Sequence, residues 1–279
     1  VILTNTAPIR RPDGSIMAGI AVLFDMTERH RLLEQLRAAR EDAEVASRAK
    51  SKFLDIAAHE LRTPVTAFSL LLQLTQMRLE KGHPVDLSVL TRLRSQVNRL
   101  SRLVTDLLEV SRLDRGLVQL KVARTDIKSL MADCCANFRM QFPHREIRLS
   151  TPSEAVELEA DPVRIYEVIS NLIDNALKYS PDHSPIDVLL ASSPEKIRVM
   201  VKDQGPGIPK DRQSTLFKAF ERGVLTGEER HAGLGLGLFI CRGIIELHKG
   251  EIGVQSEAGE GTTFYFDLPR TTPLSQVAS

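Results

Sequence analysis

A seven-residue repeat of mostly small or apolar positions runs through the first half of the chain and restricts the fold more than any other feature. From Glu28 onward these positions recur in alternating steps of four and three. They are Leu32, Leu36, Ala39, Ala43, Ala46, Lys50 and Phe53. A period of 3.5 residues places one seam along a helix and favours two helices in parallel register. We therefore predict a coiled-coil signalling helix over residues 28–50; a single amphipathic helix lying on its own domain is the alternative.

The repeat returns after a break, and this predicts a helical hairpin. Gly82-His83-Pro84 ends the first helix, and Asp86 or Ser88 can cap the second. The seam of the second helix is Leu90, Leu93, Val97, Leu100, Val104 and Leu107. One hairpin buries only part of two such seams, so we expect a homodimer in which two antiparallel hairpins over residues 51–116 form a four-helix bundle.

After Asp114-Arg115-Gly116 the pattern changes to mixed α/β. The expected strands are Arg145–Thr151, Ile186–Ala191, Ile197–Lys202, Glu251–Ser256 and Thr262–Leu268. The expected helices lie near Ile127–Phe142, Pro162–Tyr179 and Leu236–Leu247. This order predicts an α/β sandwich of helices on a mixed sheet over residues 121–270, followed by a loose tail at 271–279.

The ends and the composition of the chain add further limits. Residues 1–27 read as two strands around a turn at Pro12-Asp13-Gly14-Ser15, which we interpret as the end of a larger sensory domain. A net charge of +1 gives no support for nucleic acid or a membrane surface as partners. No apolar run approaches ~20 residues, and three cysteines without metal-ligand spacing fit a reduced compartment. We expect a cytoplasmic fragment without membrane contact of its own, and a membrane anchor upstream of Val1 stays compatible with this.

One histidine is followed directly by a glutamate and, one turn later, by a proline, in the motif His59-Glu60-Leu61-Arg62-Thr63-Pro64. A carboxylate can hold the proton of one ring nitrogen, so that the other nitrogen is free to attack. Thr63 lies one helical turn after His59 and can hold a water near the ring. Alone, the pair is better explained as a surface histidine beside a salt-bridging glutamate. Pro64 within a strong heptad helix, where it predicts a kink, strengthens the functional interpretation.

A later helix has one apolar face and one face rich in carboxamides. Glu167, Asn171, Asn175 and Lys178 step along the polar face. An amide oxygen can bind Mg²⁺ and a lysine can contact phosphate, so we predict a nucleotide site here. A mixed polar surface is the alternative.

Two glycine-rich turns enclose a long polar segment. Asp203-Gln204-Gly205-Pro206-Gly207 follows a predicted strand, where the carboxylate can accept the adenine amine. Gly233-Leu234-Gly235-Leu236-Gly237 opens a helix whose N–H groups can cradle phosphates. Neither turn is a P-loop or a dinucleotide fingerprint. The basic segment between them, residues 209–232, is predicted to be a lid over the triphosphate, with Phe217 at its base.

The order of these motifs resembles that of sensor histidine kinases of two-component systems. In that resemblance residues 59–64 correspond to the H box, 171–178 to the N box, 203–207 to the first glycine box, 217–220 to the F box, 233–237 to the second glycine box, and 259–263 to the closing glycine-threonine box. Residues 1–27 look like the tail of a PAS domain. The resemblance implies a HisKA-type phosphoacceptor domain followed by a Bergerat-fold ATPase domain.

The resemblance also implies residue roles. His59 would accept the phosphoryl group, Glu60 would act as its base, and Thr63 would orient water when the response regulator is dephosphorylated. In the ATP site, the resemblance implies that Asn171 binds Mg²⁺ and that Asn175 and Lys178 lie near the phosphates. Tyr179 would lie against adenine, Asp203 would read the adenine amine, and Arg222 would contact the γ-phosphate. The other implied nucleotide-binding residues are Asp174, Gly205, Gly207, Phe217, Gly233, Gly235, Gly237 and Thr262.

The implied activity is autophosphorylation of His59 from Mg-ATP, then transfer to an aspartate of a separate response regulator. Two other functions stay open: an ATPase clamp of the same fold, and a catalytically silent dimeric scaffold. Glu167 occupies the position of the water-activating glutamate of related ATPases. We interpret it as a polar helix residue near the site.

Overall fold

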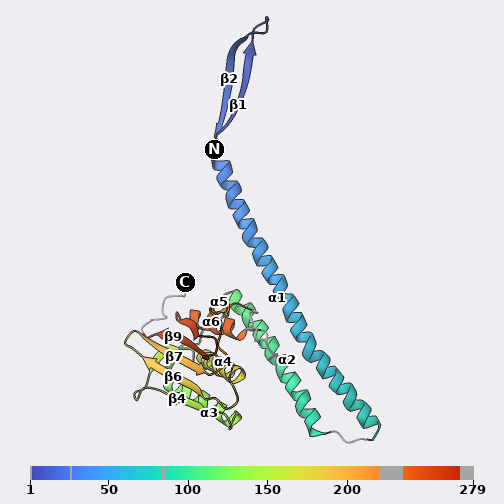
Figure 1. The fold of residues 1–279 in the computed structure, drawn as a ribbon, viewed down its shortest axis with the longest axis vertical. Coiled ribbons are helices and arrows are strands. Elements are labelled where there is room, and N and C mark those ends of the chain that lie inside the picture. Colours follow the sequence, from blue (N-terminus) through green and yellow to red (C-terminus); the bar gives the residue numbers. More distant parts are fainter. Residues whose placement is uncertain (1, 26, 83–85, 220–234, 271–279) are drawn as a thin grey trace. The chain divides into compact units, whose positions relative to one another are not determined.

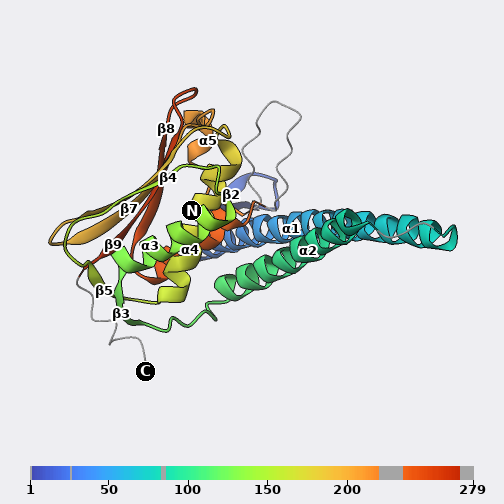
Figure 2. The same cartoon turned by 90° about the horizontal axis from the view of Figure 1, so that it is seen from below.

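The computed structural model describes residues 2–25, 27–82, 86–219 and 235–270, in two compact units, Val1–Asp55 and Ile56–Ser279. Figure 1 and Figure 2 show the elements from two directions. In the first unit, strands β1 (Ile2–Arg10) and β2 (Ile16–Asp25) form an antiparallel hairpin, as predicted. Apolar side chains of β2 stay exposed, which a two-stranded sheet cannot avoid.

Helix α1 (Thr27–Glu80) is continuous through Pro64. The assigned helix therefore shows no break at the proline, and a bend there stays a prediction. Helix α2 (Leu87–Asp114) begins at Asp86, whose carboxylate accepts hydrogen bonds from the backbone N–H and the hydroxyl of Ser88. Of the two predicted caps, Asp86 is therefore the residue that caps the helix.

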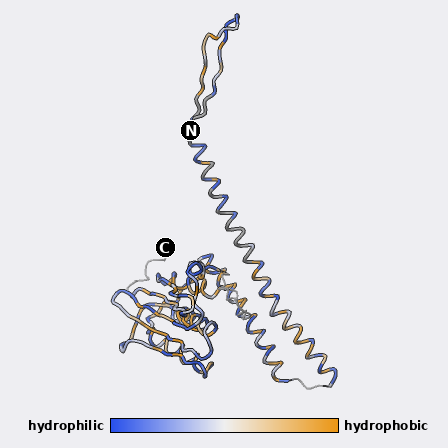
Figure 3. The backbone as a smooth tube through the Cα atoms, viewed as in Figure 1, coloured by the Kyte–Doolittle hydropathy of each residue, from blue (hydrophilic) through white to orange (hydrophobic). Residues whose placement is uncertain are grey.

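Residues 56–80 of α1 and the antiparallel α2 form the predicted helical hairpin (Figure 1). Ala57, Leu103 and Val110 are buried along it. Apolar residues recur along both helices (Figure 3), and many remain exposed in one chain. They include Leu70, Leu74, Met77, Leu90, Val97 and Val104. Pairing with a second hairpin would bury them, so the dimeric bundle remains a proposal supported by this face.

The C-terminal domain is a sheet covered on one side by helices (Figure 2). The strands, in spatial order, are β4 (Ile147–Ser150), β6 (Ile186–Ser192), β7 (Lys196–Asp203), β9 (Thr262–Pro269) and β8 (Glu251–Ser256). The covering helices are α3 (Ile127–Gln141), α4 (Pro162–Tyr179) and α6 (Gly237–Leu247). Only β4 and β6 pair in parallel. The predicted α/β sandwich is confirmed.

Alternating side chains build the core between the sheet and the helices. Ile197, Val199 and Val201 of β7 are fully buried, and so is the apolar face of α4 from Ile165 to Ile173. Period-two burial in the strand and helical burial in α4 are the patterns that identified both elements. The buried faces fix which side of α4 points away from the sheet.

Three local predictions were incomplete. The pairing of β3 (Ala123–Asp126) with β5 (Glu157–Ala160) was missed, because each strand has only four residues and few β-formers. Strand β4 starts later than expected, because the buried Arg145 side chain donates instead to the Pro181 carbonyl and the Ser180 hydroxyl. A short helix, α5 (Lys210–Gln213), opens the segment predicted as an irregular lid.

Across the described residues, no helix is long and apolar enough to cross a bilayer.

Candidate functional site

The imidazole of His59 is exposed on α1, where a reacting group can reach it. The neighbouring Glu60 is partly buried, and its carboxylate lies 3.7 Å from a guanidinium nitrogen of Arg99 on α2. The Thr63 hydroxyl donates to the His59 carbonyl at 3.2 Å. The three predicted residues thus share one stretch of α1. The ion pair to Arg99 fixes the side of the helix on which Glu60 lies.

The amide-rich face of α4 is formed as the sequence predicted. The Asn175 side-chain amide donates to Oδ1 of Asn171 at 3.3 Å. Asp174 and Lys178, also predicted as nucleotide contacts, form an ion pair with each other along the helix. Lys178 is therefore partly neutralised in this arrangement. Since both side chains are only half-buried, the pair is weak enough for an incoming phosphate to displace it.

The first glycine turn closes around Asp203, a carboxylate that is only 3% exposed. Its Oδ1 accepts the Gly205 N–H at 2.7 Å, and burial raises the pKa of this carboxyl group. A Cβ on Gly205 would lie 2.7 Å from the Tyr179 carbonyl oxygen. The turn therefore packs directly on the C-terminal end of α4. This brings Asp203 and Tyr179 together, as an adenine site requires.

The end of β9 completes that turn. Asp203 and Thr262 are register partners, and Thr262 is buried. The Ser256 hydroxyl donates to the Gly261 carbonyl, accepts from the Ile208 N–H, and lies 3.0 Å from the Thr262 hydroxyl. Ser256 joins the two loops, although no role was predicted for it from the sequence. Its only signal was its place at the end of a strand before the closing glycine-threonine box.

The second glycine turn meets the middle of α4. Gly235 has a φ of +68°, and a Cβ on Gly237 would lie 2.6 Å from the Asn171 side-chain amide. In the described part of the chain, no side chain caps the start of α6. Its N–H groups therefore point to the region beside Asn171 without a side-chain acceptor. That is a suitable environment for phosphate.

Two predicted contacts, Arg222 and Gly233, lie outside the described residues. Phe217, at the base of the predicted lid, meets Phe264 of β9 edge to face, with 6.4 Å between ring centroids. Asn171 and Tyr179 are eight residues apart on α4, which corresponds to ~12 Å of helix. One helix thus connects the amide cluster to the Asp203 turn, over a length suited to a nucleoside triphosphate.

These residues fit ATP with Mg²⁺. Asparagine oxygens are suitable ligands for a hard cation, and the uncapped start of α6 supplies N–H donors for phosphate oxygens. At Gly237 the backbone of the second glycine turn lies close to the Asn171 side-chain amide, and at Gly205 the backbone of the first turn lies close to the Tyr179 carbonyl. A side chain at either glycine would collide with these groups.

Two family models match the chain. Residues 49–116 match the His Kinase A (phospho-acceptor) domain. Residues 160–272 match the histidine kinase-, DNA gyrase B-, and HSP90-like ATPase. The chain carries the two domains of a protein-histidine kinase.

Known kinases resemble it in sequence and in fold. Alginate biosynthesis sensor protein KinB of Pseudomonas aeruginosa is 32% identical over 265 residues, which cover 94% of this chain and 42% of KinB. The histidine kinase AdeS of Acinetobacter baumannii gives a TM-score of 0.62 at 26% identity, covering 77% of this chain and 98% of that one. Histidine kinase ThkA in complex with response regulator protein TrrA gives 0.61 at 25% identity, covering 96% and 75%. The chain spans 42% to 66% of the length of the curated relatives it matches.

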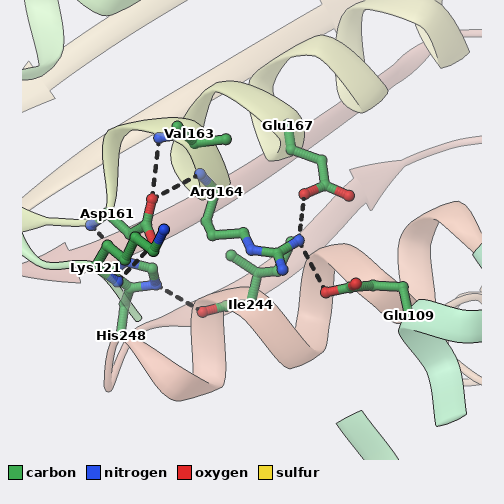
Figure 4. A network of polar contacts seen from close by, with 8 residues as sticks. All are labelled: Glu109, Lys121, Asp161, Val163, Arg164, Glu167, Ile244 and His248. Atoms are coloured by element: carbon green, nitrogen blue, oxygen red, sulfur yellow. Dashed lines mark hydrogen bonds and ion pairs between the residues drawn. The ribbon is translucent and has the colours of Figure 1, made fainter. Parts of the chain in front are cut away.

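Helix α4 is anchored at its first turn by a buried histidine, His248 (Figure 4). Asp161 caps α4 through Oδ1, and its Oδ2 accepts the Lys121 N–H at 2.7 Å. Nε2 of His248 accepts the Asp161 N–H at 3.0 Å, while Nδ1 lies 2.8 Å from the Ile244 carbonyl. A carbonyl can only accept, so the proton is on Nδ1. The ring is therefore neutral, and burial lowers its pKa below 6.5.

We expect His248→Leu to reduce the free energy of unfolding by about 1–3 kcal/mol at pH 7.5, because the buried Asp161 N–H loses its acceptor. The difference in the free energy of unfolding between the unmodified chain and the variant should become smaller at acid pH. The unfolded chain takes up a proton on His248 near pH 6.5 whereas the folded chain resists it, so the native protein loses this stability as the pH falls below about 6.5. Urea unfolding of both proteins at pH 7.5 and pH 5.5 measures the effect. An equal difference in the free energy of unfolding at the two pH values would contradict this expectation.

Proposed function

We propose that this chain transfers the γ-phosphoryl group of Mg-ATP to His59 and then to an aspartate of a separate response regulator. One observation carries the proposal: an exposed imidazole on a helical hairpin shares the chain with an amide- and glycine-lined site on α4. Neither a hydrolytic clamp nor a scaffold needs the exposed histidine. The matches to both kinase domains support the same conclusion.

Each residue has a role that follows from its surroundings. The neutral ring of His59 attacks, and Glu60 takes the proton that is lost. Asp203 accepts from the adenine amine: its carboxylate is buried, and its Oδ1 and the Tyr179 carbonyl both lie next to Gly205. Lys178 exchanges Asp174 for phosphate oxygens. Positioning these groups provides most of the rate enhancement in phosphoryl transfer.

Mg²⁺ would be held by Asn171, with Asn175 hydrogen-bonded beside it. When bound, the ion neutralises charge on the phosphates. The protein's own contribution is to orient the amides, which it does through the buried opposite face of α4. The remaining predicted contacts, Arg222 and Gly233, are proposed to act from the lid and from the second glycine turn.

The finer features of the proposal concern assembly and partners. The exposed apolar face of the hairpin supports a homodimeric bundle. Residues 28–50 of α1 would pair as a coiled coil. This coiled coil would transmit a signal from a PAS-like domain that ends near residue 27. Structural similarity to ThkA, which is described in complex with a response regulator protein, supports a receiver domain as partner. Thr63 would position water for dephosphorylation of that partner.

Glu167 is a poor candidate for the base of a hydrolytic ATPase. Its carboxylate accepts a hydrogen bond from the Arg164 guanidinium at 2.9 Å. This carboxylate is thus already engaged by a guanidinium of its own helix. Within the described residues, Glu167 gives the clamp function no specific support.

The test is incubation of the full chain with Mg²⁺ and γ-labelled ATP. We expect covalent label that is stable in base and labile in acid, and that maps by mass spectrometry to the peptide containing His59. Steady ATP hydrolysis without covalent label would support the clamp. Absence of both label and nucleotide binding would support the silent scaffold.

A further inference from the structure

An ionic cluster joins the hairpin to the nucleotide-binding helix. Nη1 of Arg164, in the first turn of α4, lies 2.8 Å from Oε1 of Glu109 on α2. The same nitrogen donates to Glu167. Figure 4 shows the guanidinium between the two carboxylates, one from each helix. This cluster belongs to neither the phosphoacceptor motif nor the glycine turns.

The Glu109–Arg164 pair is buried enough to hold the two elements together. Glu109 is only 6% exposed, and a carboxylate at such a depth is costly without a cation. Arg164 supplies this cation. If α4 moved away, Glu109 would become solvated and the pair would be lost. The pair therefore stabilises the state in which α4 rests on α2.

A second carboxylate of α2 opposes this contact. Asp106, one turn before Glu109, is half-buried and lies within electrostatic range of Glu167 and Lys178 of α4 and of Arg102 of its own helix. Burial and the charge of Glu167 raise its pKa to about 6. Asp106 is therefore mostly ionised at neutral pH and is destabilised by resting against α4. Two acids three residues apart thus have opposite effects on one contact.

The apolar part of the contact is tight at one point and open beside it. A Cβ on Gly243 of α6 would lie 2.9 Å from Cδ1 of Leu113 on α2, so the missing side chain permits close approach. Next to it is an open cleft of about 430 Å³, lined by Leu113 of α2, by Phe239 and Leu247 of α6, and by Val118, which follows α2 in the chain. Side chains that line an open cleft lack packing partners on the solvent side, so the apolar contact between α2 and α6 is limited in extent. This leaves the ion pair as a larger share of what holds the contact.

The contact also bears on the triphosphate site. Lys178, a proposed phosphate contact, lies within electrostatic range of Asp106 in this arrangement, and Glu167 adds a second negative charge. Phosphate oxygens approaching α4 would meet like charge from α2. By linkage, nucleotide binding and docking of α4 on α2 disfavour one another.

We propose that Glu109 and Arg164 form a latch that holds the ATP-binding domain on α2 in a resting state, and that Asp106 weakens the latch. The inference rests on the proposed kinase function and adds a restraint on it. Loading of ATP and release of the latch together free the domain to reach His59. The ratio of the two states is set by the opposing carboxylates of α2.

The experiment compares Glu109→Gln with Asp106→Asn in the full chain. Each change removes one negative charge from α2 with little change of shape. We expect Glu109→Gln to raise the initial rate of autophosphorylation about three- to tenfold and Asp106→Asn to lower it by a similar factor. Shifts in the same direction would show a general effect of charge and would overturn the latch.

A distance measurement separates the latch from the kinase activity. Spin labels at Arg94→Cys on α2 and Ser192→Cys at the end of β6 are both exposed, whereas the native cysteines are buried. With labelled protein diluted into excess unlabelled protein, we expect Glu109→Gln to broaden and lengthen the distance distribution and Asp106→Asn to narrow it. An unchanged distribution in Glu109→Gln would overturn the latch even if the kinase is active. Absence of phosphorylation in every form would instead count against the proposed function, while the distances still decide the latch.

Discussion

Replacing His59 with glutamine should abolish covalent labelling by γ-labelled ATP. Glutamine keeps the size and polarity of an exposed helix side chain but has no nucleophilic ring nitrogen. We expect the label to fall by about three orders of magnitude or more, as for loss of other catalytic nucleophiles. Affinity for ATP should stay within about twofold, because an exposed substitution away from the nucleotide site disturbs little.

The matched control is His144→Gln. His144 is also an exposed histidine, but it lies between α3 and β4 rather than on the hairpin. Its label and its ATP affinity should equal those of the unmodified chain. Label that persists in His59→Gln, or that is lost in His144→Gln, would place the phosphoryl acceptor elsewhere. Filter binding for label and calorimetry for ATP give the two readouts on the same preparations.

The sequence predicted the architecture because the periodicities that determine it are local. The heptad seam around Leu93 and Val97 indicated α2, and the alternation of Ile197, Val199 and Val201 indicated β7. The burial of the three β7 residues follows directly from the alternation, whereas seam residues of α2 such as Val97 stay exposed in one chain. The β3–β5 pair was not predictable in this way, since a four-residue strand contains only two periods of the alternation, too few to identify it.

The site was predictable where a motif carries its own chemistry, and not where it depends on a distant partner. Asn171 and Asp203 lie on segments that the sequence identified. By contrast, the Glu109–Arg164 pair joins residues 55 positions apart, and the link from His248 to Asp161 joins residues 87 apart. Each of these residues alone reads as an ordinary surface or helix position. Only the tertiary fold makes them partners.

The strictest steric demand in the nucleotide site falls on Gly207, and Gly207→Ala should have the largest effect of any single methyl addition there. Gly207 has a φ of +71°, and a Cβ would lie 1.9 Å from the Glu257 carbonyl oxygen and 2.7 Å from its carbon. The neighbour is backbone, so it cannot rotate away. A left-handed alanine costs roughly 1–2 kcal/mol and overpacking about 1–3 kcal/mol more. We expect the turn to shift, taking Asp203 with it, and ATP affinity to fall by about tenfold or more.

Gly259→Ala provides a control for the backbone conformation alone. Gly259 has a φ of +87°, but no heavy atom lies within 4 Å of its Cβ position. Its variant should lose only the roughly 1–2 kcal/mol of left-handed strain and keep its affinity for ATP. Thermal unfolding and calorimetric titration of the two variants separate strain from collision. If Gly207→Ala binds ATP as tightly as Gly259→Ala does, the first glycine turn is not shaped by its contact with the Glu257 backbone, and the assignment of Asp203 to the adenine site loses its steric support.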